Sequence, residues 1–257
     1  MTEPRRFTVI TLFPEMIAAF AGAGIVRRAC ERQLVAIDTL NPRVFAEDAR
    51  ATVDDTPYGG GPGMVMTVAP LRKAIDSIRS ASERPVHVVY LSPQGRTLSE
   101  AALPELAQHL HLVLLAGRYE GIDERLIERD IDSEWSLGDF VLSGGEIAAM
   151  AVIDALTRRL PGALGDERSA RQDSFGEGLL DHPHYTRPEL IEGQAVPPVL
   201  LSGNHAEIDR WRRREALGRT WLRRPDLLSG KTLSAADQKL LNEFITAVPA
   251  GSKNGVS

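Results

Sequence analysis

Short apolar runs alternate with helix-like segments through residues 1–164, and this alternation limits the fold more than any other feature of the chain. The predicted strands are residues 7–12, 86–91 and 111–116. The predicted helices begin at residue 14 and after residue 99, and then cover residues 122–128 and 146–160. Strands separated by helices predict an α/β domain, with a parallel sheet that is covered on both faces.

Size and composition are those of a globular protein. A chain of 257 residues with 43% apolar content can build at least one sizeable core, which disfavours general disorder. The single cysteine, Cys30, allows neither an internal disulfide nor a cysteine metal cluster, and this favours a reducing compartment. No uncharged apolar stretch approaches the roughly 20 residues of a membrane span, and no export signal follows Arg5 and Arg6. We therefore expect a cytoplasmic protein without membrane contact.

Residues 162–198 differ from the rest of the chain, because repeated glycines and prolines interrupt every periodic pattern. A segment of this length without regular structure predicts a linker or a functional loop. We expect an amino-terminal domain at residues 1–164, a linker at residues 165–180, and a small helical domain at residues 181–257.

Two helices are predicted in the carboxy-terminal part. Asn204, with Glu207 three residues later, predicts the start of the first, and Gly218 predicts its end. The second begins at Ser234, and the side chains that it should bury are Leu240, Leu241, Phe244 and Ile245. Residues 249–257 are expected to form a frayed tail.

Positive charge is concentrated in residues 210–231, although the whole chain carries a net charge of -5. This segment holds eight basic residues against two acidic ones, together with Trp211 and Trp221. Arginine interleaved with aromatic rings is typical of phosphate contact combined with base stacking. The segment therefore predicts RNA binding. A solvated helix face with tryptophans in the core is the alternative.

Four glycine-containing loops lie next to the predicted strands and helices. They are YGGGPGM (58–64), LSPQGR (91–96), GRYEGID (117–123) and LSGGE (142–146). Three of them fall where strands should end, and that edge of a parallel sheet is where α/β proteins bind ligands. The chain has no Gly-Lys-Ser/Thr and no GxGxxG after a strand, which disfavours a triphosphate or a standard dinucleotide. Ordinary tight turns are the alternative.

Two further groups bear on a ligand. Tyr119, Glu120 and Asp123 suit a cation such as a sulfonium, or a pair of ribose hydroxyls, better than a phosphate; solvated loop carboxylates are the alternative. His182 and His184 are two residues apart and cannot meet on one helix face. With no HExxH motif and no cysteine nearby, structural zinc is disfavoured.

Six longer segments of the chain contain motifs that have to be considered as one set. They are VDDTPYGGGPGM (53–64), YLSPQGR (90–96), GRYEGIDER (117–125), GDFVLSGGE (138–146), DSFGEGLLDHPHYTRPE (173–189) and VPPVLLSGNHAEIDRWRR (196–213). Together they resemble the bacterial tRNA (guanine-N1)-methyltransferases of the knotted SPOUT superfamily, over nearly the whole chain.

The resemblance implies methyl transfer from S-adenosylmethionine to N1 of guanosine-37, on the 3′ side of the anticodon of tRNA. It also implies a SPOUT domain with a deep trefoil knot, and a homodimer whose active site is shared between subunits. Magnesium is a further expected cofactor, with no ligands that the sequence identifies. The positions that would bind S-adenosylmethionine are Tyr90, Leu91, Ser92, Pro93, Gln94, Gly117, Tyr119, Glu120, Gly121, Ser136, Leu137, Gly138, Asp139, Phe140, Val141, Leu142, Gly144 and Gly145.

The same resemblance implies a catalytic pair. Asp173 would be the general base that removes the proton from guanine N1, and Arg158 would stabilise the charge that develops on O6. A free carboxylate is a weak base for this proton, so the guanidinium beside O6 would have to acidify the substrate, or burial would have to strengthen the base. The positions that would bind tRNA are Tyr58, Gly59, Arg210, Trp211, Arg214 and Arg219.

Three other functions remain as alternatives. A SPOUT enzyme that methylates a ribose hydroxyl needs no carboxylate for N1, so the segment around Asp173 disfavours it. An enzyme of small nucleotides has no use for the basic segment. A catalytically silent RNA-binding protein would be distinguished by its failure to incorporate methyl groups into tRNA.

Overall fold

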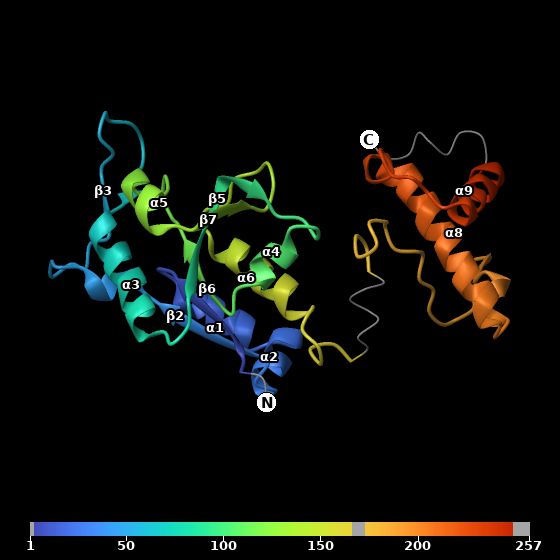
Figure 1. Cartoon of the computed structure of the whole chain (residues 1–257), viewed down its shortest axis with the longest axis horizontal. Coiled ribbons are helices and arrows are strands. Elements are labelled where there is room, and N and C mark those ends of the chain that lie inside the picture. Colours follow the sequence, from blue (N-terminus) through green and yellow to red (C-terminus); the bar gives the residue numbers. More distant parts are fainter. Residues whose placement is uncertain (1–2, 166–172, 249–257) are drawn as a thin grey trace. The chain divides into compact units, whose positions relative to one another are not determined.

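The computed structural model describes residues 3–165 and 173–248, and the chain divides into two compact units (Figure 1). The first unit is Met1–Glu167 and the second is Arg168–Ser257. The predicted tail at residues 249–257, and residues 166–172 of the predicted linker, lie outside the described residues. The division into domain, linker and domain stays a prediction.

A parallel five-stranded sheet forms the centre of the first unit. Its strands are β1 (Arg5–Ile10), β2 (Val35–Leu40), β5 (Val86–Thr97), β6 (His111–Ala116) and β7 (Ser133–Ser136). Their order across the sheet is β2-β1-β6-β5-β7. The predicted parallel α/β architecture is confirmed, and so are the three predicted strands, which correspond to β1, β5 and β6.

Helices cover both faces of this sheet (Figure 1). One face packs against α1 (Pro14–Ala21), α2 (Gly24–Glu31), α4 (Leu103–Ala107) and α6 (Glu146–Thr157). The other face packs against α3 (Val68–Ala81) and α5 (Glu124–Asp130). The predicted helices correspond to α1, α4, α5 and α6, and α6 ends three residues before the predicted end.

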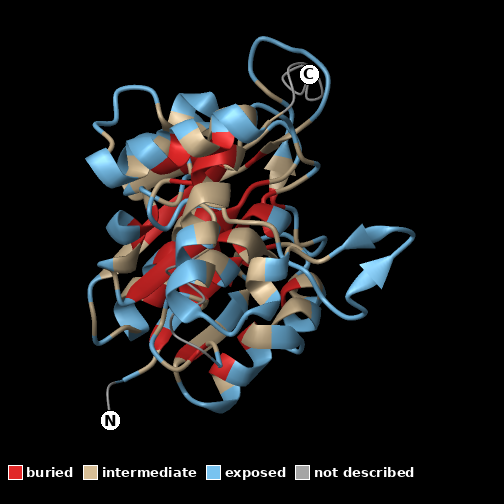
Figure 2. Ribbon diagram, turned by 90° about the vertical axis from the view of Figure 1, so that its right-hand side faces the viewer, coloured by how far each residue is buried: buried red, intermediate tan, exposed pale blue. Residues whose placement is uncertain are grey.

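The central strand β6 joins the two cores. All of its residues are buried; Leu112 and Leu114 pack into the first core, whereas Val113 and Leu115 pack into the second. This alternation is what the period of a strand requires when both faces of a sheet are covered. Figure 2 shows the buried residues gathered along the sheet, with exposed residues on the outer sides of the helices.

Short elements complete the fold. In the first unit they are η1 (Pro42–Phe45) and the hairpin of β3 (Asp54–Asp55) and β4 (Val65–Met66). In the second unit they are the exposed hairpin of β8 (Leu190–Ile191) and β9 (Gln194–Ala195), then η2 (Pro198–Leu201) and η3 (Pro225–Leu227). No helix within the described parts of the chain is long and apolar enough to cross a membrane.

Two helices, α8 (His205–Arg223) and α9 (Ala235–Ala247), pack together in the second unit. The predicted start of α8 is confirmed, because the Asn204 side chain accepts a hydrogen bond from the Glu207 amide at 3.4 Å. The predicted end at Gly218 is wrong, since the helix continues to Arg223. Gly218 is buried against the ring of Phe244, and a Cβ there would lie 2.3 Å from ring carbons. This glycine serves helix packing and does not end the helix.

The predicted start of α9 is also confirmed. The Ser234 hydroxyl accepts a hydrogen bond from the Asp237 amide at 3.0 Å and caps the helix. Leu240, Leu241 and Phe244 are buried as predicted. The prediction for Ile245 is wrong, because 36% of this residue is exposed on the outer side of the helix.

An ion pair links the two helices. Arg213 donates to both carboxylate oxygens of Asp237, at 2.9 Å each, and its remaining terminal nitrogen donates to Glu177 at 2.6 Å. The hydrogen bond from Arg213 holds the pKa of Asp237 below its ordinary value. The two-pronged geometry makes this contact stronger than an isolated surface pair.

Gly218→Ala tests the close packing of α8 on α9. Alanine ordinarily stabilises a helix interior relative to glycine, but here we expect the clash with Phe244 to lower the free energy of unfolding by about 1–3 kcal/mol. The measurement is urea denaturation. Phe244→Leu in the same chain should relieve the clash, so the double variant should lose less than the sum of the single variants. A Gly218→Ala protein more stable than the parent would contradict this packing.

Asp237→Asn tests the ion pair. Since the folded-state pKa of Asp237 is lowered, the stabilisation is present above the unfolded value of about 4 and is lost as the pH falls through the folded value. We expect a deficit of about 1–2 kcal/mol in the free energy of unfolding at pH 7, closing below about pH 4. Asp209→Asn is the control, because Asp209 pairs with Arg212 while 74% of its side chain is exposed. A deficit independent of pH would argue against the ion pair.

Candidate active site

A cavity of about 470 Å³ lies beside residues 90–94 of β5 and at the carboxyl ends of β6 and β7. Its walls come from three stretches of chain, residues 90–94, 117–124 and 135–145. Of the positions predicted to bind the cofactor, all except Gly138 and Asp139 line this cavity. Gly138 lies in a turn closed by the Ser136 hydroxyl, and Asp139 is exposed. The structure therefore brings three of the predicted loops together around one cavity.

The first wall is an excursion from β5. The strand pairs with Trp135 of β7 through Leu91, leaves the sheet, and pairs with Trp135 again through Arg96. Residues 92–95 of the LSPQGR motif form this excursion. The sequence predicted this motif at the end of a strand, whereas in the structure it lies inside β5. A Cβ on Gly95 would lie 2.4 Å from the Trp135 backbone nitrogen, and only glycine allows this return.

The second wall, residues 117–123, is held from both sides. The Gly145 amide donates to the Gly117 carbonyl at 2.9 Å, which ties the second wall to the third. On the other side the Glu120 amide donates to the Met64 carbonyl, and the Met66 amide donates to the Gly121 carbonyl, each at 2.9 Å. The YGGGPGM, GRYEGID and LSGGE motifs are thus joined through their backbones.

Glycines allow these walls to approach each other. The Tyr90 ring packs on Gly117 and Gly121, where a Cβ would lie 2.9 Å from a ring carbon and 3.1 Å from the phenol oxygen, respectively. A Cβ on Gly145 would lie 2.6 Å from the Ala116 Cα at the end of β6. The backbone itself therefore forms much of the cavity surface, as a ligand held by amides and carbonyls requires.

A buried carboxylate lies next to the third wall, at the start of α6. Glu146, the first residue of α6, is fully buried; it accepts a hydrogen bond from the Thr11 hydroxyl at 2.7 Å and lies 2.8 Å from an Arg118 guanidinium nitrogen. The contact with Arg118 is an ion pair and not an aligned hydrogen bond, since Glu146 Oε2 has no hydrogen-bond partner. Thr11 follows β1 and Arg118 follows β6, so Glu146 joins the ends of two strands to α6.

Acidic groups give the cavity a preference for cations. Glu120 and Glu124 line it, and Glu134 of β7 lies behind Ser92; burial raises the pKa of Glu134. Burial also raises the pKa of Tyr90, so its phenol is protonated at neutral pH. Asp123 has a different task from the one predicted: it caps α5 by accepting the Arg125 amide at 3.0 Å, and the hydrogen bond from the Arg125 side chain lowers its pKa.

The predicted catalytic residues belong to different units. Arg158 follows the last residue of α6 in the first unit, and Asp173 is among the first described residues of the second unit. Both side chains are half-buried, and both have contacts within the protein. Of the predicted tRNA-binding residues in the first unit, Tyr58 is fully exposed, and Gly59 has a φ of 86° in the turn between β3 and β4.

Neighbouring carboxylates neutralise much of the basic segment 210–231. Five of its arginines take part in ion pairs: Arg210 with Glu243, Arg212 with Asp209, Arg213 with Asp237 and Glu177, Arg214 with Glu215, and Arg224 with Asp226. Within residues 173–248, Arg219 and Arg223 of this segment have no carboxylate partner. The sequence count of charges therefore overstates the positive field.

An aromatic group lies beside this segment. Trp211 of α8 has its ring centroid 6.2 Å from that of His182 and 6.3 Å from that of Tyr185. Such rings are suited to stacking with bases. Trp221, the other tryptophan of the segment, is half-buried next to the core of the second unit, as the alternative interpretation held.

The sequence missed several residues that line the cavity, notably Arg118, Glu124 and Trp135. Arg118 and Glu124 lie inside the GRYEGIDER motif, which was the available signal. Trp135 belongs to β7, a strand of four residues that begins with polar side chains and gives no apolar run.

The chain is similar to known proteins over most of its length. The family model described as tRNA (Guanine-1)-methyltransferase TrmD matches residues 5–230. The chain is similar to the tRNA (guanine-N(1)-)-methyltransferase of Halorhodospira halophila, with 57% identity over 98% of this chain and 95% of that protein. It is also similar to the proteins of the same name from Cronobacter sakazakii (58% identity) and Escherichia coli (57%), each over 93% of both chains.

Glu146→Gln tests the buried ion pair between Glu146 and Arg118. The change keeps the side-chain volume but leaves the Arg118 guanidinium, which is only 18% exposed, without a carboxylate. We expect the free energy of unfolding to fall by about 3 kcal/mol, and the affinity for S-adenosylmethionine, measured by calorimetry, to fall with it. Glu100→Gln is the control, because Glu100 pairs with Arg159 at a partly exposed position and its loss should cost less than about 1 kcal/mol. Equal losses of unfolding free energy in the two variants would contradict the conclusion that burial makes the Glu146 ion pair more important than the Glu100 pair.

Proposed function

Because this chain belongs to the tRNA (guanine-1)-methyltransferase family, we propose that it transfers a methyl group from S-adenosylmethionine to N1 of guanosine-37 in tRNA. The observation that carries the proposal is the single cavity into which three family motifs converge. Its volume of about 470 Å³ is within the range of small-molecule sites.

S-adenosylmethionine suits this cavity for two reasons. The backbone around Gly117, Gly121 and Gly145 forms a cradle that side chains would fill, and the carboxylates of Glu120 and Glu124 favour a positively charged ligand. When bound, the cofactor supplies a methyl group on a sulfonium. In this proposal the residues that line the cavity hold and orient it; Gly138 and Asp139 shape the neighbouring turn.

Asp173 and Arg158 are the proposed catalytic residues. Guanine N1 carries a proton in the neutral base, and Asp173 would accept this proton as the nitrogen attacks. Negative charge then develops on O6, where the guanidinium of Arg158 would donate hydrogen bonds. These hydrogen bonds would make the N1 proton of guanine more acidic, so that a carboxylate such as Asp173 could accept it. Arg158 belongs to the first unit and Asp173 to the second, and the proposal includes a homodimer whose active site is shared between subunits.

The second unit is the proposed tRNA-binding part. Arg219 and Arg223, which have no carboxylate partner among the described residues, are suited to direct phosphate contacts, and Trp211 is suited to stacking. Arg210 and Arg214 would have to exchange their present partners, Glu243 and Glu215, for phosphate. Tyr58 and Gly59 would approach the target base from the first unit.

Further features of the family belong to the proposal. We include the trefoil knot, the homodimer and a cytoplasmic location; large apolar side chains that remain exposed around the third wall, Phe140, Val141 and Ile147, support the homodimer. Magnesium fits less well. Among the described residues the one group of acidic and histidine side chains close enough to hold an ion contains two imidazoles, which magnesium disfavours, so we assign magnesium no step.

Asp173→Asn tests the proposed base. The carboxamide cannot accept the N1 proton, so we expect methyl transfer to fall by at least about 100-fold while binding of S-adenosylmethionine is unchanged. The assay incubates labelled cofactor with unmodified tRNA and identifies the methylated nucleoside by mass spectrometry after digestion. N1-methylguanosine supports the proposal; methyl on a ribose would instead support the alternative SPOUT reaction.

Glu189→Gln is the matched control for this experiment. It makes the same carboxylate-to-amide change at an exposed residue that precedes the β8–β9 hairpin. We expect its rate to equal that of the parent. An Asp173→Asn enzyme that is as active as Glu189→Gln would overturn the assignment of the base.

A further inference from the structure

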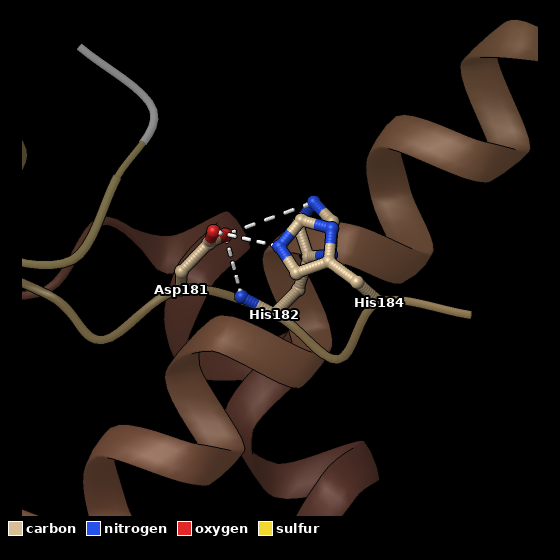
Figure 3. A group of neighbouring side chains, drawn as sticks. All are labelled: Asp181, His182 and His184. Carbon is tan, nitrogen blue, oxygen red and sulfur yellow. Dashed lines mark hydrogen bonds and ion pairs between the residues drawn. The ribbon is translucent and has the colours of Figure 1, made fainter. Parts of the chain in front are cut away.

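Three side chains that the proposed reaction does not use lie together in the second unit (Figure 3). Asp181, His182 and His184 precede the β8–β9 hairpin, and their ligand atoms all lie within 4.8 Å of one another. Both imidazole rings lie on the same side of the Asp181 carboxylate (Figure 3). On a helix, two histidines that are two residues apart could not bind the same zinc ion. This argument does not apply to His182 and His184, because residues 180–186 are not helical.

The distances between the ligand atoms are near those around a tetrahedral ion. His184 Nε2 lies 2.8 Å from one carboxylate oxygen of Asp181, and His182 Nε2 lies 3.7 Å from the other. Around zinc, ligands at about 2.0–2.2 Å in tetrahedral geometry are roughly 3.3–3.5 Å apart. Small rotations of the three side chains would therefore bring them to ligating positions.

The hydrogen bonds of His182 favour the form that binds metal. Its Nδ1 lies 3.1 Å from the Pro183 carbonyl oxygen, a group that can only accept, so Nδ1 carries the proton. Nε2, which faces Asp181, is then left with a free lone pair. A ring nitrogen that donates to a backbone carbonyl while the other ligates the ion is the usual arrangement around metal-bound histidine.

The surroundings hold the group in place and leave one side open. The His182 amide donates to Asp181 at 2.7 Å, and the Asp181 amide donates to the Ser174 hydroxyl at 3.0 Å. The side chains of Asp181 and His182 are 22% and 18% exposed and the His182 ring approaches Trp211, whereas the side chain of His184 is 70% exposed. Solvent can therefore supply a fourth ligand.

We propose that Asp181, His182 and His184 bind a divalent transition-metal ion of the zinc type. Two imidazoles and one carboxylate suit zinc, cobalt or nickel, whereas magnesium and calcium require oxygen ligands. Binding replaces the hydrogen bond between His184 and Asp181. Because the Asp181 amide donates to the Ser174 hydroxyl, an ion held by Asp181 would also restrain Ser174, the residue that follows Asp173.

The test is metal binding by the full chain without an affinity tag and without tRNA, so its outcome is independent of methyl transfer. Zinc is titrated against a chromophoric chelator, and cobalt is added separately to record its visible absorption spectrum. We expect one zinc ion per chain, a tetrahedral cobalt spectrum, and no displacement of zinc by a large excess of magnesium.

Variants identify the ligands. His184→Ala removes an exposed side chain and should leave folding, followed by circular dichroism, unchanged; it should weaken zinc binding by at least about tenfold, as should Asp181→Asn. His205→Ala, at an exposed histidine that begins α8, is the control and should bind as the parent does. Absence of zinc uptake by the parent, parent-like binding by His184→Ala, or displacement of zinc by magnesium would each overturn the proposal.

Discussion

The buried ion pair between Glu146 and Arg118 organises the first unit. It lies where the ends of β1 and β6 meet the start of α6. Two of the three stretches that form the cavity adjoin these elements: residues 117–124 follow β6, and residues 135–145 lead into α6. A charge with no exposed surface is tolerated only when its partners are fixed, so Glu146 dictates where Thr11 and Arg118 must be. Arg118 lies in the stretch in which Gly117 and Gly121 contact Tyr90, and Gly145, the residue before Glu146, contacts Ala116.

The elements that the sequence predicted carry a local signature that can be recognised along the chain. The all-apolar β6 and the capped starts of α8 and α9 were recognisable, because a doubly covered strand and a helix cap each leave a local signature. β7 is too short and too polar for such a signature. Helix α3 was not predicted from the sequence, although Leu71, Ala74, Ile75 and Ile78 recur at helical spacing and a proline in the first turn is typical of a helix start. Gly218 misled because the same residue ends helices and allows helices to pack closely; only the position of Phe244 decides between the two roles.

For the candidate site, the motifs predicted which loops converge, but not how the groups within them divide their tasks. Asp123 and Glu120 are three residues apart in one motif, yet the first caps a helix and the second lines the cavity. The roles of the charged residues in the basic segment 210–231 likewise could not be predicted from the sequence. Arginines counted along the chain suggest a continuous positive surface, whereas carboxylates from α9 and from residue 177 pair with several of them in space.

The glycine-built walls of the cavity have a consequence for inhibitors. At Gly117 and Gly145 a side chain would come closer than 3.0 Å to the protein's own atoms, and at Gly121 it would be strained by the φ of 125°, so substitutions that exclude a competing compound are costly at these positions. A molecule that derives its affinity from the amides and carbonyls of these walls would leave an organism few escape mutations there. Resistance would have to arise by other routes, such as altered uptake or higher expression.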